Sequence, residues 1–312
     1  MKLKKIKEGK IEFWIPSEDK YKAPVFYNPE GEFVRDISIS VIQTFQREFN
    51  KRIIILDALS GTGARGLRYA KEITNVKKVF LNDKNPVAVK LIKKNVKNNR
   101  LSKKCEIKNL DANVLMHQKV FNVIDLDPFG TPNIFLDSAS RSIYHKGLLA
   151  ITATDQAPLC GTYPLTCLKK YGILSIKTDY YAELGVRILI SNIILSLAKR
   201  EKAFIPLLIH STKHYFRIFG KIEHLGKIRN LLKDFGYVMD CSCGNREYGE
   251  IKEKCFCGKK FKICGSVYLG KIIDKEFCKK VLKDLEKRDF RLKKDEEKLM
   301  KLLIEEAEMP PF

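Results

Sequence analysis

The sequence lacks any long apolar segment. The most apolar stretch, residues 186–198, is short, and Arg187 and Asn192 interrupt it. Because a membrane-spanning helix needs about 20 apolar residues, we expect this stretch to form a buried helix, and we expect no membrane partner. The N-terminus carries lysines with no apolar signal core behind them, so nothing in it indicates export and we expect a cytoplasmic protein.

Acidic residues are few relative to basic ones. The chain has 59 Lys and Arg against 37 Asp and Glu, a formal net charge of +22. Such an excess attracts a polyanion, and RNA or DNA is the obvious one. The alternative is a lysine-rich, heat-adapted protein whose ion-rich surface serves stability. The charge therefore favours a nucleic-acid partner and leaves the second interpretation open.

Internal repeats and low-complexity linkers are also absent. Hydrophobic residues make up 45% of the 312 positions, which is a globular composition. A chain of this length can bury a sizeable core, and two domains are the natural expectation.

Short apolar runs alternate with helical stretches from residue 53 onwards. The runs that we interpret as strands are 53–58, 78–83, 105–112, 120–128, 147–155, 204–212 and 215–222. The helices expected among them are 63–73, 86–99 with Pro86 in its first turn, 135–143 and 182–200. Apolar strands separated by helices indicate an α/β fold with a parallel sheet covered on both faces.

The composition changes past about residue 222. Cysteines occur in pairs, lysines become frequent, and two charged amphipathic helices are expected at 276–290 and 293–307. We therefore predict two domains: residues 1–222, comprising the sheet domain and an N-terminal extension, and residues 223–312, a smaller basic α+β domain that contains the paired cysteines.

A glycine-rich turn follows the first strand of the sheet. Gly61, Gly63 and Gly66 match the pattern G-x-G-x-x-G between a strand and a helix. The first two glycines let the backbone turn sharply and approach a ligand closely. The pattern alone does not choose between a dinucleotide and another nucleotide-like cofactor.

Acidic residues at the strand ends favour one cofactor. Asp57 would repel a pyrophosphate but suits the cationic S-adenosylmethionine. Asp83 fits a ribose diol, and Asp111 with the small Ala112 could meet an adenine ring. The structural alternative for Asp57 and Asp111 is a helix cap or a turn. Because these acids fall where open α/β sheets bind ligands, we predict a methyltransferase rather than a dehydrogenase.

The sequence DPFG follows the fourth strand. An exocyclic base amine is a poor nucleophile, so its methylation needs a carboxylate that accepts from N–H and a ring that fixes the base plane. Asp127 and Phe129 can supply these groups, with Pro128 stiffening the link and offering its carbonyl. The base must first leave its stack. The structural alternative is a tight turn with Phe129 in the core.

Four cysteines form two C-x-C-G motifs eleven residues apart. Cys241, Cys243, Cys255 and Cys257 could bind a tetrahedral structural zinc ion, with free thiols as the alternative. Four cysteine ligands leave no open position for catalysis. We leave Cys264 out of the quartet, and we expect the lone His214 to be structural or to contact RNA.

Six sequence blocks in order resemble the tRNA (guanine-26-N2)-dimethyltransferases, in an archaeal-like short form. The blocks are 26–29 (FYNP), 35–38 (RDIS), 56–72 (LDALSGTGARGLRYAKE), 125–132 (DLDPFGTP), 151–155 (ITATD) and 183–189 (ELGVRIL). The resemblance implies that residues 1–222 form a class I, Rossmann-like methyltransferase domain and that residues 223–312 form a basic, cysteine-containing domain that docks tRNA. The implied reaction transfers one or two methyl groups from S-adenosylmethionine to N2 of guanine 26 in tRNA.

The resemblance also implies roles for individual residues. It assigns cofactor contacts to Arg35, Arg65, Asp83, Asp111 and Ala112. It places Phe26 in the base pocket, for which simple core packing is the alternative. It assigns the catalytic segment to Asp127 and Phe129.

Relatives resembling this chain continue past its final Pro-Pro-aromatic sequence, so we expect weaker tRNA binding than in longer relatives. The remaining alternatives are an enzyme acting on another RNA guanine or a DNA amine, a nicotinamide-dependent oxidoreductase, and a non-catalytic RNA-binding module. Oligomeric state is not predictable from the sequence.

Overall fold

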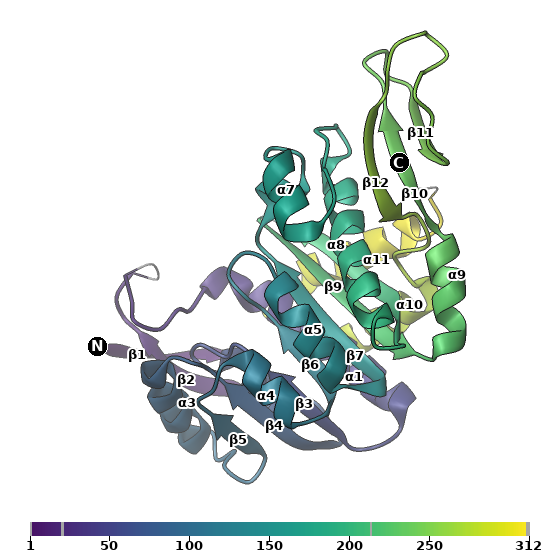
Figure 1. The fold of residues 1–312 in the computed structure, drawn as a ribbon. Coiled ribbons are helices and arrows are strands. Elements are labelled where there is room, and N and C mark those ends of the chain that lie inside the picture. Colours follow the sequence, from purple (N-terminus) through teal and green to yellow (C-terminus); the bar gives the residue numbers. More distant parts are fainter. Residues whose placement is uncertain (1, 20–21, 213, 310–312) are drawn as a thin grey trace.

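A seven-stranded sheet forms the centre of the computed structural model, which describes residues 2–19, 22–212 and 214–309 (Figure 1). Its strands are β3 (Ile53–Asp57), β4 (Val76–Asn82), β5 (Cys105–Lys108), β6 (Phe121–Leu126), β7 (Ile143–Ala153), β8 (Ala203–Thr212) and β9 (Tyr215–Glu223). Each lies where the apolar runs predicted a strand.

The strand order in this sheet is β5-β4-β3-β6-β7-β9-β8. All strands run parallel except β9, which pairs antiparallel with both β7 and β8. The chain leaves β3 toward β4 and β5 on one side, then returns to place β6 and β7 on the other. This reversal puts a topological switch point between β3 and β6, where open α/β sheets bind ligands. The predicted α/β, class I methyltransferase architecture is confirmed.

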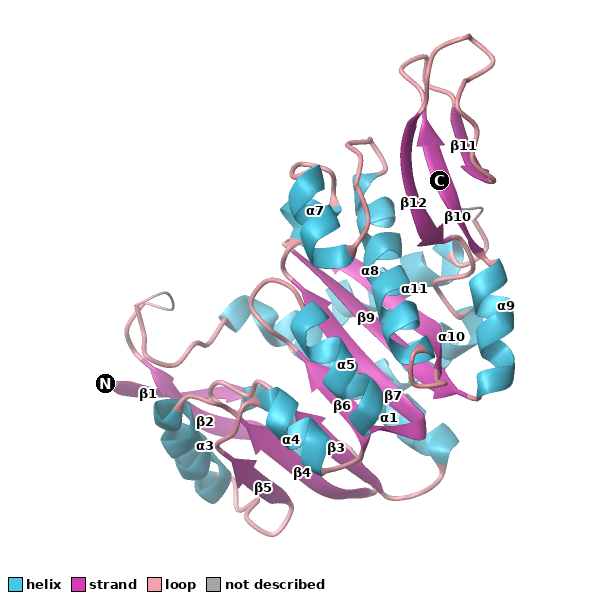
Figure 2. Cartoon of the chain, in the orientation of Figure 1, coloured by secondary structure: helices cyan, strands magenta, loops and turns pink. Residues whose placement is uncertain are grey.

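Helices cover both faces of the sheet (Figure 2). One face carries α1 (Glu32–Phe49), α2 (Ala64–Glu72), α3 (Pro86–Asn98), α10 (Lys275–Leu285) and α11 (Lys293–Glu306). The other carries α4 (Ala112–Gln118), α5 (Asn133–Ser142), α6 (Gln156–Leu159), α7 (Pro164–Tyr171) and α8 (Tyr181–Ala198). Because side chains alternate along a strand, Leu56 faces the second layer while its neighbour Ile55 faces the first.

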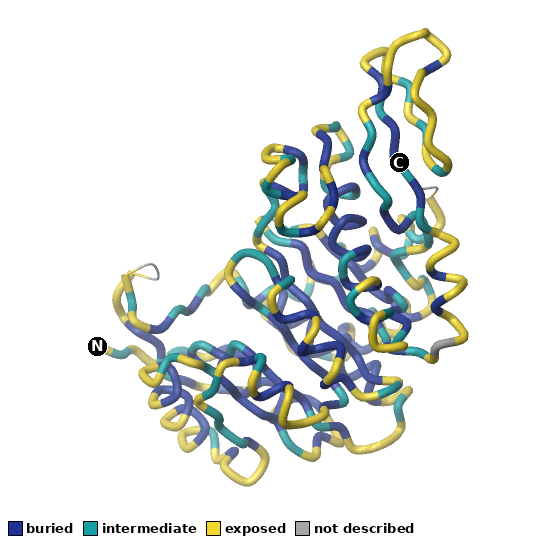
Figure 3. The backbone as a smooth tube through the Cα atoms, in the orientation of Figure 1, coloured by how far each residue is buried: buried dark blue, intermediate teal, exposed yellow. Residues whose placement is uncertain are grey.

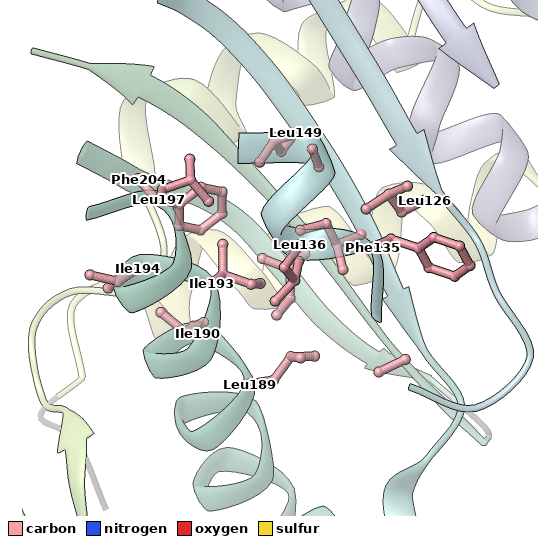
Figure 4. Close-up of a cluster of buried hydrophobic side chains, with 14 of the residues drawn as sticks. Leu126, Phe135, Leu136, Leu149, Leu189, Ile190, Ile193, Ile194, Leu197 and Phe204 are labelled. Carbon is pink, nitrogen blue, oxygen red and sulfur yellow. The ribbon is translucent and has the colours of Figure 1, made fainter. Parts of the chain in front are cut away.

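The apolar segment near residue 190 is a core helix. Figure 4 shows Leu189, Ile190 and Ile193 of α8 directed at α5 and β7, and all three are fully buried. By length and composition alone this helix could cross a membrane, but 61% of its 18-residue window is buried inside the protein. The prediction of a buried helix is therefore confirmed.

An N-terminal hairpin and the long helix α1 complete the first layer, and the sequence patterns had not indicated them. The hairpin consists of β1 (Leu3–Glu8) and β2 (Ile11–Pro16), which pair antiparallel. Helix α3 begins as predicted, with Pro86 in its first turn and the Asn85 side chain accepting a hydrogen bond from the N–H of Val87.

The cysteine-rich segment forms a separate small sheet. Strands β10 (Phe235–Asp240), β11 (Arg246–Gly249) and β12 (Lys262–Tyr268) follow the short helix α9 (Ile228–Lys233), with β10 in the centre. Figure 3 shows that the end of this small sheet farthest from the large sheet is mostly exposed. Helices α10 and α11 return to the large sheet and share its core with α1. The division at residue 222 stays a prediction.

Candidate active site and metal centre

The glycine turn after β3 is built by backbone geometry. Gly61 and Gly63 have φ values of 54° and 83°, a left-handed conformation that disfavours other residues. A side chain on Gly66 would meet Leu81 and the Asp57 carboxylate at 2.9 Å, so this glycine lets α2 lie close to the sheet. The sharp turn expected of Gly61 and Gly63 is present, and the close approach to a ligand stays a prediction.

Asp57 is enclosed by that turn. Its carboxylate accepts a hydrogen bond from the N–H of Gly66 at 2.9 Å, and only 2% of the residue is exposed. Burial and the neighbouring Asp125 raise the pKa of Asp57 to about 7. The structure thus gives Asp57 the capping arrangement that the sequence left open, and its contact with a cofactor stays a prediction.

Two further acids lie at the same edge with accessible side chains. Asp83 follows β4, is half-buried, and accepts from the N–H groups of Gly61 and Asn85, both at 2.8 Å. Asp111 follows β5, is exposed, and caps α4 by accepting from the Asn113 N–H, while Ala112 beside it is buried. Both acids thus line the edge that the glycine turn borders.

The DPFG segment reaches the same edge from β6. Phe129 is 75% exposed, and its ring meets the ring of Phe26 edge-on at 4.7 Å between centroids. The carbonyl oxygen of Phe26 lies 3.2 Å from where a Cβ on Gly61 would be. Phe26 therefore connects Phe129 to the glycine turn, and core packing of Phe129 is excluded by its exposure. Pro128, between Asp127 and Phe129, is buried.

Arg65 links the acid of this segment to α2. Its Nη2 donates to Asp127 Oδ2 at 2.5 Å, and the Asp127 side chain is 34% exposed. In the described part of the chain, no donor reaches the other carboxylate oxygen, Oδ1. Arg65 is itself buried and donates through Nη1 to the Ser38 hydroxyl. The structure thus assigns Arg65 an orienting contact with Asp127 in addition to any cofactor contact.

A buried ion pair supports Arg65, and the sequence reasoning missed it. Arg217 donates from both terminal nitrogens to Asp125, at 2.8 and 2.7 Å, and Tyr69 donates to the same carboxylate. Burial alone would raise the pKa of Asp125, but the charges of Arg217 and Arg65 outweigh it and lower the pKa. The available signal was a charged residue among apolar ones in each of two strands, Asp125 in 121–126 and Arg217 in 215–223.

Arg35 lies in a second buried network, next to the FYNP segment. It donates to both oxygens of Glu8, at 2.7 and 2.6 Å, and to the carbonyl oxygen of Asn28. Tyr27 donates to the same Glu8 carboxylate. Arg35 thus fixes the turn that follows Phe26, and its predicted contact with a cofactor stays a prediction.

The four predicted metal ligands converge at the tip of the small sheet. The sulfur atoms of Cys241, Cys243, Cys255 and Cys257 all lie within 4.8 Å of one another. The pairs 241–257 and 243–255 are 3.6 and 3.7 Å apart. Tetrahedral zinc with Zn–S bonds of about 2.3 Å requires sulfur atoms about 3.8 Å apart, so these residues fit a structural zinc ion.

Cys264 is excluded from this centre by its position. It is fully buried, lies opposite Val238 in β12, and belongs to the core on the α8 side of the large sheet. His214 is exposed in the turn between β8 and β9, which is compatible with the expectation of a structural or RNA-contacting role.

The fold and the edge of strand ends define a class I methyltransferase. Residues 5–312 match the family model described as N2,N2-dimethylguanosine tRNA methyltransferase. The chain belongs to this family.

Comparisons with individual proteins agree over nearly the whole chain. The chain is 41% identical to the tRNA (guanine(26)-N(2))-dimethyltransferase of Methanosphaera stadtmanae, covering 98% of this chain and 81% of that protein. It is 35% identical to the tRNA (guanine(26)-N(2)/guanine(27)-N(2))-dimethyltransferase of Aquifex aeolicus, covering 95% and 78%. The solved structure of Trm1 from Pyrococcus horikoshii with S-adenosyl-L-methionine has a TM-score of 0.86 and 35% identity, covering 97% and 83%.

Proposed function

We propose that this protein transfers one or two methyl groups from S-adenosylmethionine to N2 of guanine 26 in tRNA. The observation that carries the proposal is the convergence of the glycine turn, the Asp127 carboxylate and the exposed Phe129 ring at one switch point, in a chain of this family. The enzyme is expected to work in the cytoplasm.

The strand-end residues fit S-adenosylmethionine. Gly61 and Gly63 leave the turn without side chains, and the small Ala112 leaves room for a flat ring. The Asp83 carboxylate can accept from ribose hydroxyls while keeping its contacts to Gly61 and Asn85, because each oxygen has a second lone pair. S-adenosylmethionine, when bound, supplies the methyl group by in-line displacement at its sulfonium, with no covalent enzyme intermediate.

The base pocket is proposed to lie between Phe26, Phe129 and Asp127. Guanine flips out of its stack, and the exposed Phe129 ring fixes its plane by stacking. Asp127 accepts a hydrogen bond from N2–H, draws the nitrogen toward the donor and takes up its proton as the new bond forms. The carbonyl oxygen of Pro128 can accept the second N–H.

Arg65 is proposed to orient the Asp127 carboxylate. Because Arg65 occupies Oδ2, the rotation of the carboxylate is restricted and Oδ1 is presented toward the base. Arg65 is fixed in turn by its ion pair with Asp125 and its hydrogen bond to the Ser38 hydroxyl, and Arg217 contacts both of these partners.

The proposal is tested by incubating the purified protein with labelled S-adenosylmethionine and an unmodified tRNA transcript. We expect N2-methylguanine, mono- or dimethylated, at position 26, mapped by mass spectrometry of nuclease digests. A transcript with adenine at position 26 is the control. No label in tRNA, together with measurable NADH binding, would contradict the proposal.

A second target position is supported by one comparison. The Aquifex aeolicus relative is named for both guanine 26 and guanine 27. The same digests separate the two, because a transcript with guanine at both positions reports each site in a different fragment.

A further inference from the structure

The cysteine finger, residues 241–262, contains two knuckles with equivalent backbone geometry. In the first, the N–H groups of Cys241 and Gly244 donate to the carbonyl oxygens of Asn245 and Cys241. In the second, Cys255 and Gly258 donate in the same way to Lys259 and Cys255. All four hydrogen bonds are 2.9 Å long. The knuckles therefore impose the same requirements on the residue between their two cysteines.

That residue differs sharply between the knuckles. The first has Ser242, whereas the second has Phe256, a residue that is 84% exposed. The serine shows that the turn needs no ring at this position. Since exposing a phenyl ring to water is unfavourable, the structure of the knuckle does not account for Phe256.

The finger already has its own apolar core, and Phe256 is not part of it. Phe261 is 8% exposed and packs with Met239, Cys241 and Cys255. Phe256 lies between two cysteines whose side chains turn inward to the sulfur cluster, so its ring projects outward. Figure 3 shows the tip of the finger as an exposed loop distant from the large sheet.

Basic residues flank Phe256 in the sequence. The finger has six basic residues, Arg246, Lys252, Lys254, Lys259, Lys260 and Lys262, against three acidic ones, Glu247, Glu250 and Glu253. Lys252 and Lys260 form ion pairs within the finger, but Lys254 and Lys259 form none with the described residues. These lysines also offset the negative charge of four thiolates. A ring flanked by unpaired lysines suits a polyanion that has flat, stackable faces.

The base of the finger is connected to the catalytic edge. Arg246 pairs with Asp179 and lies over the Tyr180 ring at 4.7 Å, in the segment that joins α7 to α8. At the start of that segment, the carbonyl oxygen of Lys170 in the last turn of α7 accepts a hydrogen bond from Asn133, which begins α5 shortly after the DPFG segment. Figure 1 shows that α7 and the finger project from the same end of the molecule.

We propose that the tip of the cysteine finger is a second tRNA contact, in which Phe256 stacks on an unpaired base and Lys254 and Lys259 contact adjacent phosphates. This inference rests on the proposed tRNA substrate and adds a contact outside the catalytic pocket. The zinc ion would serve it by holding the second knuckle rigid, so that the ring is presented without loss of conformational freedom on binding.

The test replaces Phe256 by the residue of the sister knuckle. Phe256→Ser is compared with Phe256→Tyr, which keeps a ring, and with Ser242→Ala, which changes the same position of the other knuckle. The probe is an unmodified tRNA transcript titrated at several salt concentrations. A lost stacking contact weakens binding about 5- to 100-fold in Phe256→Ser. Phe256→Tyr and Ser242→Ala should bind like the wild type.

The lysines give an independent readout. Lys254→Ala/Lys259→Ala should weaken binding and reduce the slope of log affinity against log salt by about 1.4 to 1.8, whereas Phe256→Ser should leave the slope unchanged. Zinc content and S-adenosylhomocysteine affinity should stay at wild-type values in every variant, which shows that the finger and the sheet domain remain folded.

Some results would overturn the proposal. One is tRNA affinity in Phe256→Ser within twofold of the wild type, with zinc retained. Another is a loss of self-association in that variant with no loss of RNA binding, because it would assign the ring to a second copy of the chain. If the wild type binds tRNA but transfers no methyl group, the catalytic proposal fails and the finger contact does not.

Discussion

The sheet edge that carries Asp127 and the cysteine finger hold their side chains in place by different means. At the edge, Asp127 is held by Arg65, which is backed by a fully buried ion pair and two apolar layers. At the finger, the buried side chains of Met239 and Phe261 and the four convergent cysteine sulfur atoms hold the knuckles in place. A large core can position a charge without a metal, whereas a short hairpin cannot bury enough surface and needs an ion to close it.

The largest effect is expected at the catalytic edge. Asp127→Ala should lower the rate of methyl transfer by about 10²- to 10⁴-fold, because the amine loses its hydrogen-bond acceptor and proton acceptor. Single-turnover transfer to tRNA measures the rate, and calorimetry with S-adenosylhomocysteine should show nearly unchanged affinity.

The control for this prediction is Asp137→Ala, an exposed acid on α5 that pairs weakly with Arg200. Its turnover should equal that of the wild type. Wild-type turnover in Asp127→Ala would show that the catalytic role is misassigned.

The buried pair behind Arg65 should dominate stability. Arg217→Met leaves the Asp125 charge buried without its main partner, which costs about 3–5 kcal/mol of unfolding free energy. The double variant Asp125→Leu/Arg217→Met should recover part of that loss, since no lone charge remains. Denaturant titration monitored by circular dichroism measures both.

Arg200→Ala removes an exposed arginine–aspartate pair and is the matched control, for which little change is expected. Equal losses of unfolding free energy in Arg200→Ala and Arg217→Met would show that the buried pair contributes no more to stability than the exposed one.

Removing the metal should affect the cysteine finger and leave the seven-stranded sheet folded. A chelator should release one zinc ion per chain and weaken tRNA binding at least as much as Phe256→Ser does, because the knuckles lose their closure. The thermal transition of the seven-stranded sheet should change little, since none of its core residues is a ligand. Zinc analysis and calorimetry follow the two effects, and unfolding of the whole protein on chelation would contradict the comparison.

The smallest expected effect is a difference in pH response. Burial raises the pKa of Glu296 in α11 to about 10, with the neighbouring Asp36 carboxylate adding to the shift. Arg68 pairs with Asp36, so Glu296 is the group that holds the proton. Its stabilising contribution is complete below the unfolded pKa of about 4.5 and is lost as pH rises toward 10.

Glu296→Gln removes this dependence. The unfolding free energy of this variant relative to the wild type should increase between pH 6 and 9, as measured by denaturant titration. The slope of that increase against pH should correspond to about one proton or less. The finger should respond in the opposite sense, because acid protonates its thiolates and releases the metal. Parallel pH curves for wild type and Glu296→Gln would contradict the assignment.

Much of the fold follows from local sequence. The apolar runs predicted all seven strands of the sheet, and the helix starting at Pro86 was correctly placed, because strand burial and helix capping are encoded over a few residues. The two C-x-C-G motifs likewise predicted the sulfur cluster, since each knuckle is a local turn. The acids at the strand ends were predicted to share one edge, which parallel topology guarantees.

Tertiary structure decided which charges meet. Nothing within the strand 121–126 indicates that Asp125 pairs with Arg217, which lies 92 residues away in sequence. Nor could the sequence show that Arg65 contacts Asp127, that Glu8 occupies Arg35, or that α10 and α11 return to the core beside α1. Local patterns specify which residues are buried, but the partner of a buried charge depends on how distant segments pack, because desolvated charges are stable only where the assembled fold brings an opposite charge to them.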